Sequence, residues 1–291
     1  METRWMHVTS ENFKDLREAS DGVCVIPMGC IEKHGLHLPL GTDVFEASGV
    51  AYEASKLEPF CVFPDFIFGD VAGNYPSMPA GSVTLTVETE MLVLDELCSQ
   101  ISRNGFKKIL ILNGHGGNGP WLNTFLRRLG NKKRDYVLAY YMLQLPALKT
   151  LGEYLVNNGS GSIPELTLSD EKYLIEAYKN KMRGGHACLG ETAFLMAMYP
   201  EDVRLDRLGI EDGQNKHISD KFKEAGITVA DGGWGFDFPN AYCGDDPVGC
   251  TETIGKAALR FEAERFANAV RVYKEDTLLI EDNEKRNRGW D

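Results

Sequence analysis

The segment that most constrains the fold runs from residue 108 to residue 141. The run Lys-Ile-Leu-Ile-Leu at residues 108–112 predicts a buried strand. A glycine-rich turn follows, then a helical pattern over about residues 120–129 and a second strand-like run over residues 136–141. A strand, a glycine-rich loop, a helix and a strand in this order form a parallel crossover unit. The chain is therefore expected to build a parallel sheet covered by helices.

Other segments extend this alternation along the chain. Residues 23–26 predict a buried strand that ends at Pro27, and residues 61–63 predict another. Residues 144–184 show a less regular pattern. Helical spacing predicts three further helices, over residues 45–56, 87–104 and 252–275. With neither a repeat nor a low-complexity linker, we expect one α/β domain over residues 1–291, with a mostly parallel sheet flanked by helices.

The charge balance restricts the possible partners. The net charge is −12, and an acidic surface repels the phosphates of nucleic acids. No apolar run reaches the roughly 20 residues that span a membrane, and residues 1–17 lack the features of a signal peptide. The seven cysteines are odd in number and form no Cys-x-x-Cys pair, so we interpret them as reduced, mostly buried thiols. These features predict a cytoplasmic protein that binds neither nucleic acid nor membranes.

Three of the six histidines lie in glycine-flanked turns beside carboxylates. Imidazole and carboxylate are the usual protein ligands of zinc, manganese and iron. In the first turn, Glu32 and His34 are two residues apart, so both side chains point the same way in an extended segment. Asp43 follows a turn that can return it to the same place. Charged side chains are common at strand ends, so a solvated loop is the alternative for this segment alone.

The other two turns are also ambiguous when taken singly. His115 lies within Asn-Gly-His-Gly-Gly-Asn, where the glycines let the backbone approach a ligand closely. One alternative is a tight turn with a surface histidine. A phosphate-binding loop is less well supported, because neither a G-x-G-x-x-G pattern nor a G-K-[ST] ending is present. In the third turn, His186 precedes Glu191, which begins a predicted helix. A glutamate at a helix start also serves simply to complement the helix dipole.

Together, the three turns resemble the creatininase (creatinine amidohydrolase) family in order and spacing. That family has an E-x-H-G-x-H-L-P-x-x-T-D block, an N-G-H-G-x-N block and an H-A-G-x-x-E-T block. This chain matches them at residues 32–43, 113–118 and 186–192. Residues 75–82 and 244–247 resemble two further stretches, so the resemblance runs from about residue 20 to residue 275. It implies a creatininase-like α/β fold and a metal-dependent hydrolase.

The resemblance also implies two divalent metal ions per chain, zinc or manganese or one of each, with iron as a further candidate. Carried over by position, Asp43 bridges the two ions. Glu32 and His115 hold one ion, and His34 and Glu191 hold the other. The resemblance further implies a homo-oligomer, with a hexamer as the expected form and with sites near subunit contacts.

Two departures from the family pattern affect this set. Creatininase itself has a glutamate two residues after the loop histidine, where this chain has Gly117. Members with a glycine-rich loop use the glutamate of the third block instead, and Glu191 fits that role. Cys188 stands where glycine is usual. For His37, in the first block, a supporting role and a direct catalytic role both stay open.

Such a set suits hydrolysis, because metal coordination lowers the pKa of water from about 15.7 to about 7. His186 is the candidate that protonates the leaving group, and Glu191 is counted beside it as a catalytic residue. The leading function is cleavage of a C–N bond in a small, cyclic amide or formamide. The alternatives are cleavage of a C–C bond in a cyclic diketone such as an oxidised inositol, and a non-catalytic ligand-binding paralogue. The five candidate ligands disfavour the last, because buried carboxylates are costly without a cation.

The substrate is open within this family, which also includes formamide hydrolases, a peptide-trimming enzyme of cofactor synthesis and a ring-opening hydrolase of oxidised inositols. In creatininase, aromatic residues near the metal loop pack against the substrate ring. This chain has glycines after His115 and no tryptophan between Trp121 and Trp234, so creatinine itself is disfavoured as the substrate. The aromatic segment 234–239 is either a pocket wall or ordinary packing.

Overall fold

The computed structural model describes residues 1–71, 78–143 and 149–289. Within them, four strands form one sheet in the order β2-β1-β3-β4, and every neighbouring pair is parallel. The predicted α/β fold with a parallel sheet is therefore confirmed. The strands are β1 (Val23–Met28), β2 (Cys61–Val62), β3 (Lys108–Asn113) and β4 (Val137–Met142).

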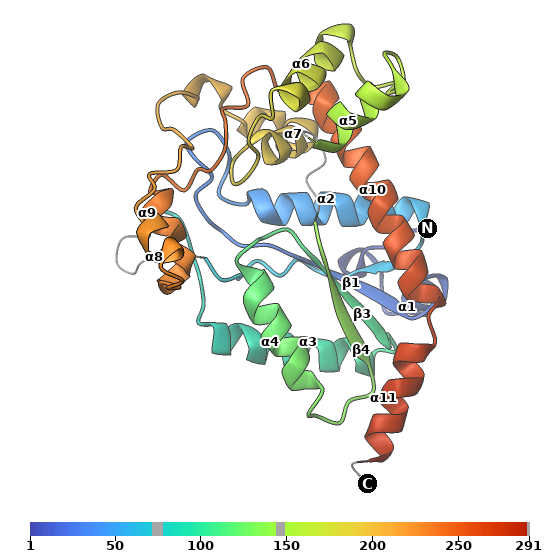
Figure 1. The fold of residues 1–291 in the computed structure, drawn as a ribbon. Coiled ribbons are helices and arrows are strands. Elements are labelled where there is room, and N and C mark those ends of the chain that lie inside the picture. Colours follow the sequence, from blue (N-terminus) through green and yellow to red (C-terminus); the bar gives the residue numbers. More distant parts are fainter. Residues whose placement is uncertain (72–77, 144–148, 290–291) are drawn as a thin grey trace.

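Helices cover both faces of this sheet (Figure 1). Alternate residues of β1 point to opposite faces, so Val23 and Val25 join one core cluster while Cys24 and Ile26 join the other. The first cluster includes side chains of α2 (Thr42–Leu57), α7 (Leu189–Met198) and α10 (Glu252–Glu275). The second includes side chains of α1 (Phe13–Ala19), α3 (Val87–Arg103) and α4 (Asn118–Leu129). Burial on both faces explains why the strands are continuous apolar runs.

Strand β1 continues beyond Ile26, where the sequence predicts its end. In β1, Val25 and Pro27 both direct their carbonyl oxygens away from β3, and these oxygens accept hydrogen bonds from Phe63 and Phe66. The missing N–H of Pro27 faces the same side, where β2 has already ended at Val62. No ladder hydrogen bond is lost there, so the strand extends to Met28.

The segment expected to be less regular contains two helices, α5 (Lys149–Asn158) and α6 (Leu168–Lys179). Thr167 and Asp170 form a capping box at the start of α6. Asp170 also accepts hydrogen bonds from Thr251, the N-cap of α10, and from Thr253 in its first turn. A short sequence signal and a distant contact thus stabilise a helix whose apolar periodicity is weak.

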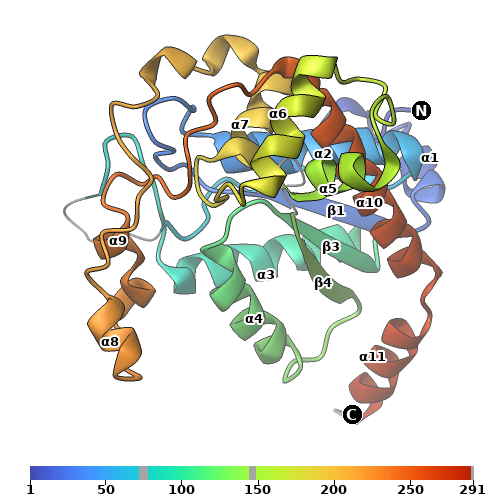
Figure 2. The same ribbon diagram turned by 45° about the horizontal axis from the view of Figure 1, so that its top comes forward.

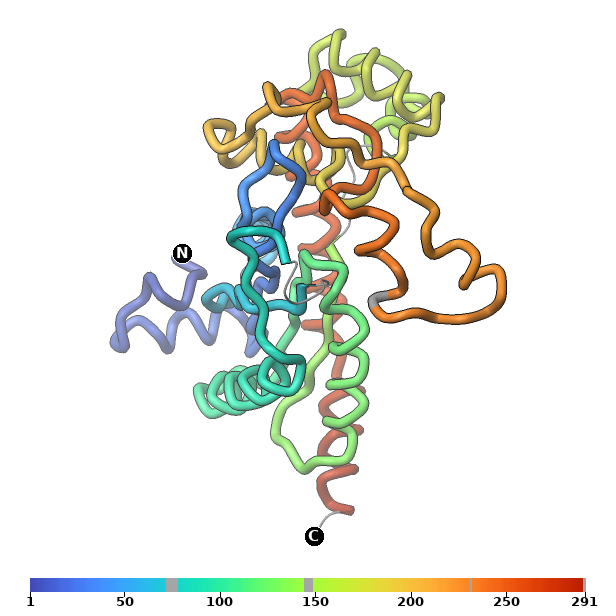
Figure 3. The backbone as a smooth tube through the Cα atoms, turned by 90° about the vertical axis from the view of Figure 1, so that its left-hand side faces the viewer, coloured from blue at the N-terminus to red at the C-terminus, as the bar shows by residue number. Residues whose placement is uncertain are grey.

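The carboxyl ends of the strands point toward a region bounded by α7 and by α9 (Trp234–Asp237) (Figure 2). The short helices α8 (Asp220–Glu224) and α9 (Trp234–Asp237) lie on a segment that projects from one side of the body (Figure 3). The last helix, α11 (Leu278–Arg288), lies near the carboxyl terminus. Among the described helices, none is long and apolar enough to cross a membrane.

Candidate metal centre

The start of α2 is wedged between the loops that follow β1 and β3. A Cβ atom at Gly29 would lie 2.5 Å from the backbone nitrogen of Val44, and one at Gly114 would lie 2.5 Å from the carbonyl oxygen of Asp43. Both distances are too short for any side chain, so only glycine allows this approach. The close packing brings Asp43 beside the side chains of both loops.

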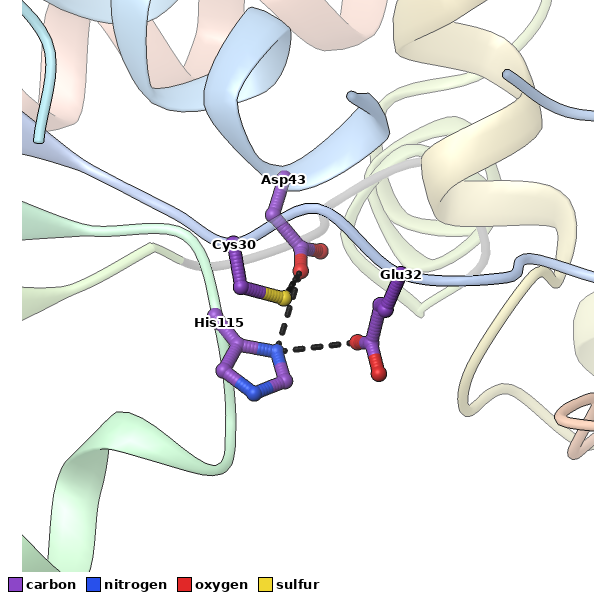
Figure 4. Close-up of side chains that lie close together, drawn as sticks. All are labelled: Cys30, Glu32, Asp43 and His115. Carbon is purple, nitrogen blue, oxygen red and sulfur yellow. Dashed lines mark hydrogen bonds and ion pairs between the residues drawn. The ribbon is translucent and has the colours of Figure 1, made fainter. Parts of the chain in front are cut away.

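The Asp43 carboxylate lies at the centre of the site and uses both oxygens. Oδ1 lies 3.1 Å from Nε2 of His34. Oδ2 lies 3.0 Å from Nδ1 of His115 and accepts a hydrogen bond from the Cys30 thiol, also at 3.0 Å (Figure 4). Burial alone would raise the pKa of Asp43, but the two histidines outweigh burial and hold this pKa well below its usual range. Asp43 is therefore placed to belong to two groups of ligands at once.

The first group consists of Cys30, Glu32, Asp43 and His115, whose ligand atoms all lie within 4.8 Å of one another. Nδ1 of His115 is 3.0 Å from Oε1 of Glu32 (Figure 4). All four side chains are buried. These donors are a thiol, two carboxylates and an imidazole, a combination that suits a divalent transition metal.

The second group consists of His34, Asp43 and Glu191, within the same 4.8 Å limit. Nε2 of His34 lies 3.8 Å from Oε2 of Glu191, which also accepts a hydrogen bond from the backbone of Ala187. Burial raises the pKa of Glu191 to about 8. Burial lowers the pKa of His34, but the surrounding carboxylates outweigh it and raise this pKa to about 10. Without a metal ion, a proton on His34 supplies the positive charge that the carboxylates require.

The three predicted histidines share one arrangement. Each has one ring nitrogen within hydrogen-bond distance of a backbone carbonyl and directs the other toward the carboxylates. Nε2 of His115 lies 2.8 Å from the carbonyl of Asp70, and Nε2 of His186 lies 2.8 Å from that of Lys33. Nδ1 of His34 lies 3.2 Å from the carbonyl of Glu32. A carbonyl only accepts, so the bonded nitrogen carries the proton, an arrangement typical of histidines that bind metals through the other nitrogen.

His186 lies between the two groups. Its ring stacks on that of His34 with centroids 4.0 Å apart, and its Nδ1 is 3.7 Å from Oε1 of Glu32. These three residues form a further set that could hold an ion. Burial and the neighbouring His34 lower the pKa of His186 to about 4, so the ring is neutral near pH 7.

A pocket of about 420 Å³ opens over these side chains. Trp234 forms part of its wall, with its ring edge-on to His186 at 5.4 Å between centroids. Of the two interpretations of the aromatic segment, a pocket wall is therefore the one that Trp234 supports. The lining residues are Glu32, Asp43, Gly114, His115, Gly116, Gly117, Met142, Leu143, Gly185, His186, Glu191 and Trp234.

His37 lies outside both groups and does not line this pocket. It is buried, with its Nε2 bonded to the carbonyl oxygen of Ala187 at 2.9 Å and its ring packed against Tyr242. Burial lowers its pKa to about 4. Among the two roles left open by the sequence, this geometry favours support of the turn that precedes Glu191.

In the stretch 75–82, residues 75–77 lie outside the described part of the chain.

Sequence reasoning missed two buried residues at this site. Cys30 was grouped with the apolar thiols, although the two-residue spacing that links Glu32 to His34 also links Cys30 to Glu32. Glu46 lies one turn after Asp43 on α2 and is fully buried, and neither of its carboxylate oxygens has a hydrogen-bond partner. Burial, Glu191 and Asp43 together raise the pKa of Glu46 well above its usual value.

Comparisons with known proteins identify the family of this chain. The family model described as creatinine amidohydrolase (creatininase) matches residues 6–270. The creatinine amidohydrolase of Pseudomonas putida is 21% identical over 65% of this chain and 69% of that protein. The mycofactocin precursor peptide peptidase of Mycolicibacterium smegmatis is 32% identical, over 38% of this chain and 46% of that protein.

Solved structures match over nearly the whole chain. A putative creatinine amidohydrolase from Bacteroides fragilis superposes with a TM-score of 0.70 at 23% identity, covering 96% of this chain and 99% of that one. Creatininase structures of a Zn–Zn type and with Mn match with TM-scores of 0.69 and 0.68, each at 18% identity, covering 95% of this chain and 100% of those chains. These matches show a shared fold over nearly the whole chain. The chain therefore belongs to the creatininase family of creatinine amidohydrolases.

Proposed function

We propose that this protein hydrolyses a C–N bond in a small amide or formamide with the help of two divalent ions. Asp43 would bridge the ions, with Glu32 and His115 on one and His34 and Glu191 on the other. The observation that carries this proposal is the shared arrangement of the histidines, whose free nitrogens face buried carboxylates. Buried carboxylates are costly without a compensating cation, so the residues fit the ions.

When bound, such ions lower the pKa of water and polarise the carbonyl under attack. The protein's own groups then manage the proton. The carbonyl of Lys33 fixes the proton of His186 on Nε2, which leaves the Nδ1 lone pair facing Glu32. Nδ1 can accept a proton from the attacking water and pass it to the leaving nitrogen. Glu191 lines the same pocket, where its carboxylate can orient the water.

The pocket favours a small substrate. Its volume of about 420 Å³ lies near the lower end of the usual range for ligand pockets, which is roughly 300–1,000 Å³. The matched relatives are an amidohydrolase and a peptide peptidase, and both names denote cleavage of amide bonds. They favour C–N cleavage over the C–C alternative. We further infer that residues 1–291 form one domain and that the protein assembles as a homo-oligomer, with a hexamer as the expected form.

Two measurements test this function. Elemental analysis of protein purified without chelator should show about two zinc, manganese or iron ions per chain. A panel of cyclic amides, formamides, short peptides and cyclic diketones, scored for loss of substrate and for freed amine, ammonia or formate, should show turnover of a C–N substrate. The absence of all these metals would overturn the dinuclear site. Turnover of the diketones alone would overturn C–N specificity while keeping the metals.

A further inference from the structure

Cys30 differs from the other cysteines in the side chains that surround it. Within the described residues, it is the cysteine that belongs to a group able to hold a metal ion. Cys24, for comparison, is equally buried but packs in the apolar core with Cys61. Cys30 precedes Glu32 by two residues, and Figure 4 shows both side chains and Asp43 directed toward the same imidazole. The backbone after β1 therefore aims the thiol into the site.

The contacts of this group indicate that the Cys30 thiol does more than pack in the core. The Cys30 sulfur lies 3.0 Å from Oδ2 of Asp43, and the same oxygen lies 3.0 Å from Nδ1 of His115. Glu32 Oε1 is buried and accepts no hydrogen bond, although it lies 3.0 Å from that nitrogen. Nε2 of His115 is engaged by a backbone carbonyl, which reserves Nδ1 for the group. A sulfur, a nitrogen and two carboxylates thus converge on one point.

We propose that Cys30 is a sulfur ligand of the ion held by Glu32, Asp43 and His115, and that it biases this site toward zinc over manganese. Thiolate is a soft donor that favours zinc, whereas oxygen-rich sets suit manganese. The neighbouring group of His34, Asp43 and Glu191 has no sulfur, so the two sites would differ in their preference for zinc over manganese. On binding, the thiol proton is released to solvent and the sulfur donates its electron pair to the ion. This inference rests on the metal centre of the proposed function.

X-ray absorption at the zinc edge tests the proposal directly. Zinc-loaded wild-type protein should show a sulfur neighbour at about 2.3 Å, with roughly one sulfur for every two zinc ions. The sulfur signal should disappear in Cys30→Ser, which keeps a hydroxyl able to donate to Asp43. It should persist in Cys98→Ser, the matched control, because Cys98 is a buried thiol on α3 outside the ligand groups.

Metal competition gives a second readout. Cys30→Ser should weaken zinc binding by at least the ~10- to 100-fold that follows loss of an outer partner of a metal ligand. Manganese binding should change less, so the ratio of zinc to manganese affinity should fall. Cobalt-loaded wild-type protein should also show a thiolate-to-cobalt charge-transfer band that Cys30→Ser lacks and Cys98→Ser retains.

The outcomes separate this inference from the proposed function. Bound zinc with only nitrogen and oxygen neighbours in the wild-type protein would overturn the role of Cys30 and leave the hydrolase proposal standing. Failure of the wild-type protein to bind zinc, manganese or cobalt would overturn both. If Cys30→Ser does not fold, as judged by circular dichroism, the wild-type spectrum alone still decides the matter.

Discussion

Replacing Asp43 with asparagine tests whether one carboxylate joins the two halves of the site. The change keeps the size of the side chain but leaves a single oxygen. In the wild-type protein, Oδ1 faces His34 while Oδ2 faces His115 and Cys30. Whichever way the asparagine amide turns, one group of ligands meets an NH₂ group in place of an oxygen. Both groups also lose the negative charge, so we expect both ions to bind weakly in Asp43→Asn.

The size of the effect follows from linkage between binding and folding. An ion present at 100 times its Kd stabilises the folded state by about 2.7 kcal/mol, so two ions contribute roughly 5 kcal/mol. In a chain of this length, 1 kcal/mol corresponds to about 2 °C in Tm. A chelator should therefore lower the Tm of the wild-type protein by roughly 10 °C. It should scarcely change the Tm of Asp43→Asn, which has little metal to lose.

The assay combines metal content with Tm in the presence and absence of chelator. His186→Ala is the comparison, because we assign this residue to proton transfer. That variant should keep both ions and the chelator effect while its rate falls by roughly 10² to 10⁴. Retention of one ion and half of the chelator effect in Asp43→Asn would refute the bridge. Loss of metal from His186→Ala as readily as from Asp43→Asn would show that His186 is a ligand, as its proximity to Glu32 and His34 allows.

Three further expectations concern Glu90, Trp234 and the assembly of the protein. Glu90 is fully buried with neither oxygen hydrogen-bonded, and burial raises its pKa to about 8. In the unfolded chain, Glu90 loses its proton at lower pH than in the folded protein. The free energy of unfolding should therefore fall by up to about 1.4 kcal/mol per pH unit between roughly pH 4.5 and 8. Urea titrations of Glu90→Gln should show a flatter pH dependence. Trp234→Ala should raise KM roughly 2- to 10-fold without loss of metal, because an aromatic contact contributes about 0.5–1.5 kcal/mol; an unchanged KM would place the substrate elsewhere. Light scattering at micromolar concentration should give an oligomer, and a single-chain mass would contradict the proposed assembly.

The parts of the fold that local pattern determines could be predicted from the sequence. Buried strands such as 108–112 and the long amphipathic helix at Glu252–Glu275 have strong periodicity, and both occur where expected. Strand β1 was predicted too short because the effect of Pro27 depends on which neighbour its nitrogen faces. That fact belongs to the sheet order β2-β1-β3-β4, which no local pattern contains.

The same division applies to the site. Residue types and turn positions predicted that His34, His115 and His186 would meet carboxylates, and the structure brings them together. Which ring nitrogen faces the carboxylates could not be predicted, because it is set by carbonyls of distant residues, such as Asp70 for His115. Glu46 was missed for a related reason, since its lack of partners depends on the packing around α2.

One steric fact explains the glycine at position 117 of the glycine-rich loop. A Cβ atom at Gly117 would lie 2.5 Å from the carbonyl oxygen of Asp70 and closer still to Nε2 of His115. These two atoms form the hydrogen bond that fixes the His115 ring, so a side chain at position 117 would displace that bond. In this packing, a carboxylate at position 117 would therefore disturb the ring of His115, which is a candidate ligand. Glu191 instead lies in the first turn of α7, and its Oε2 is 3.8 Å from Nε2 of His34. The packing therefore explains why position 117 is glycine in this chain, and it leaves Glu191 as the carboxylate that we propose for the second ion.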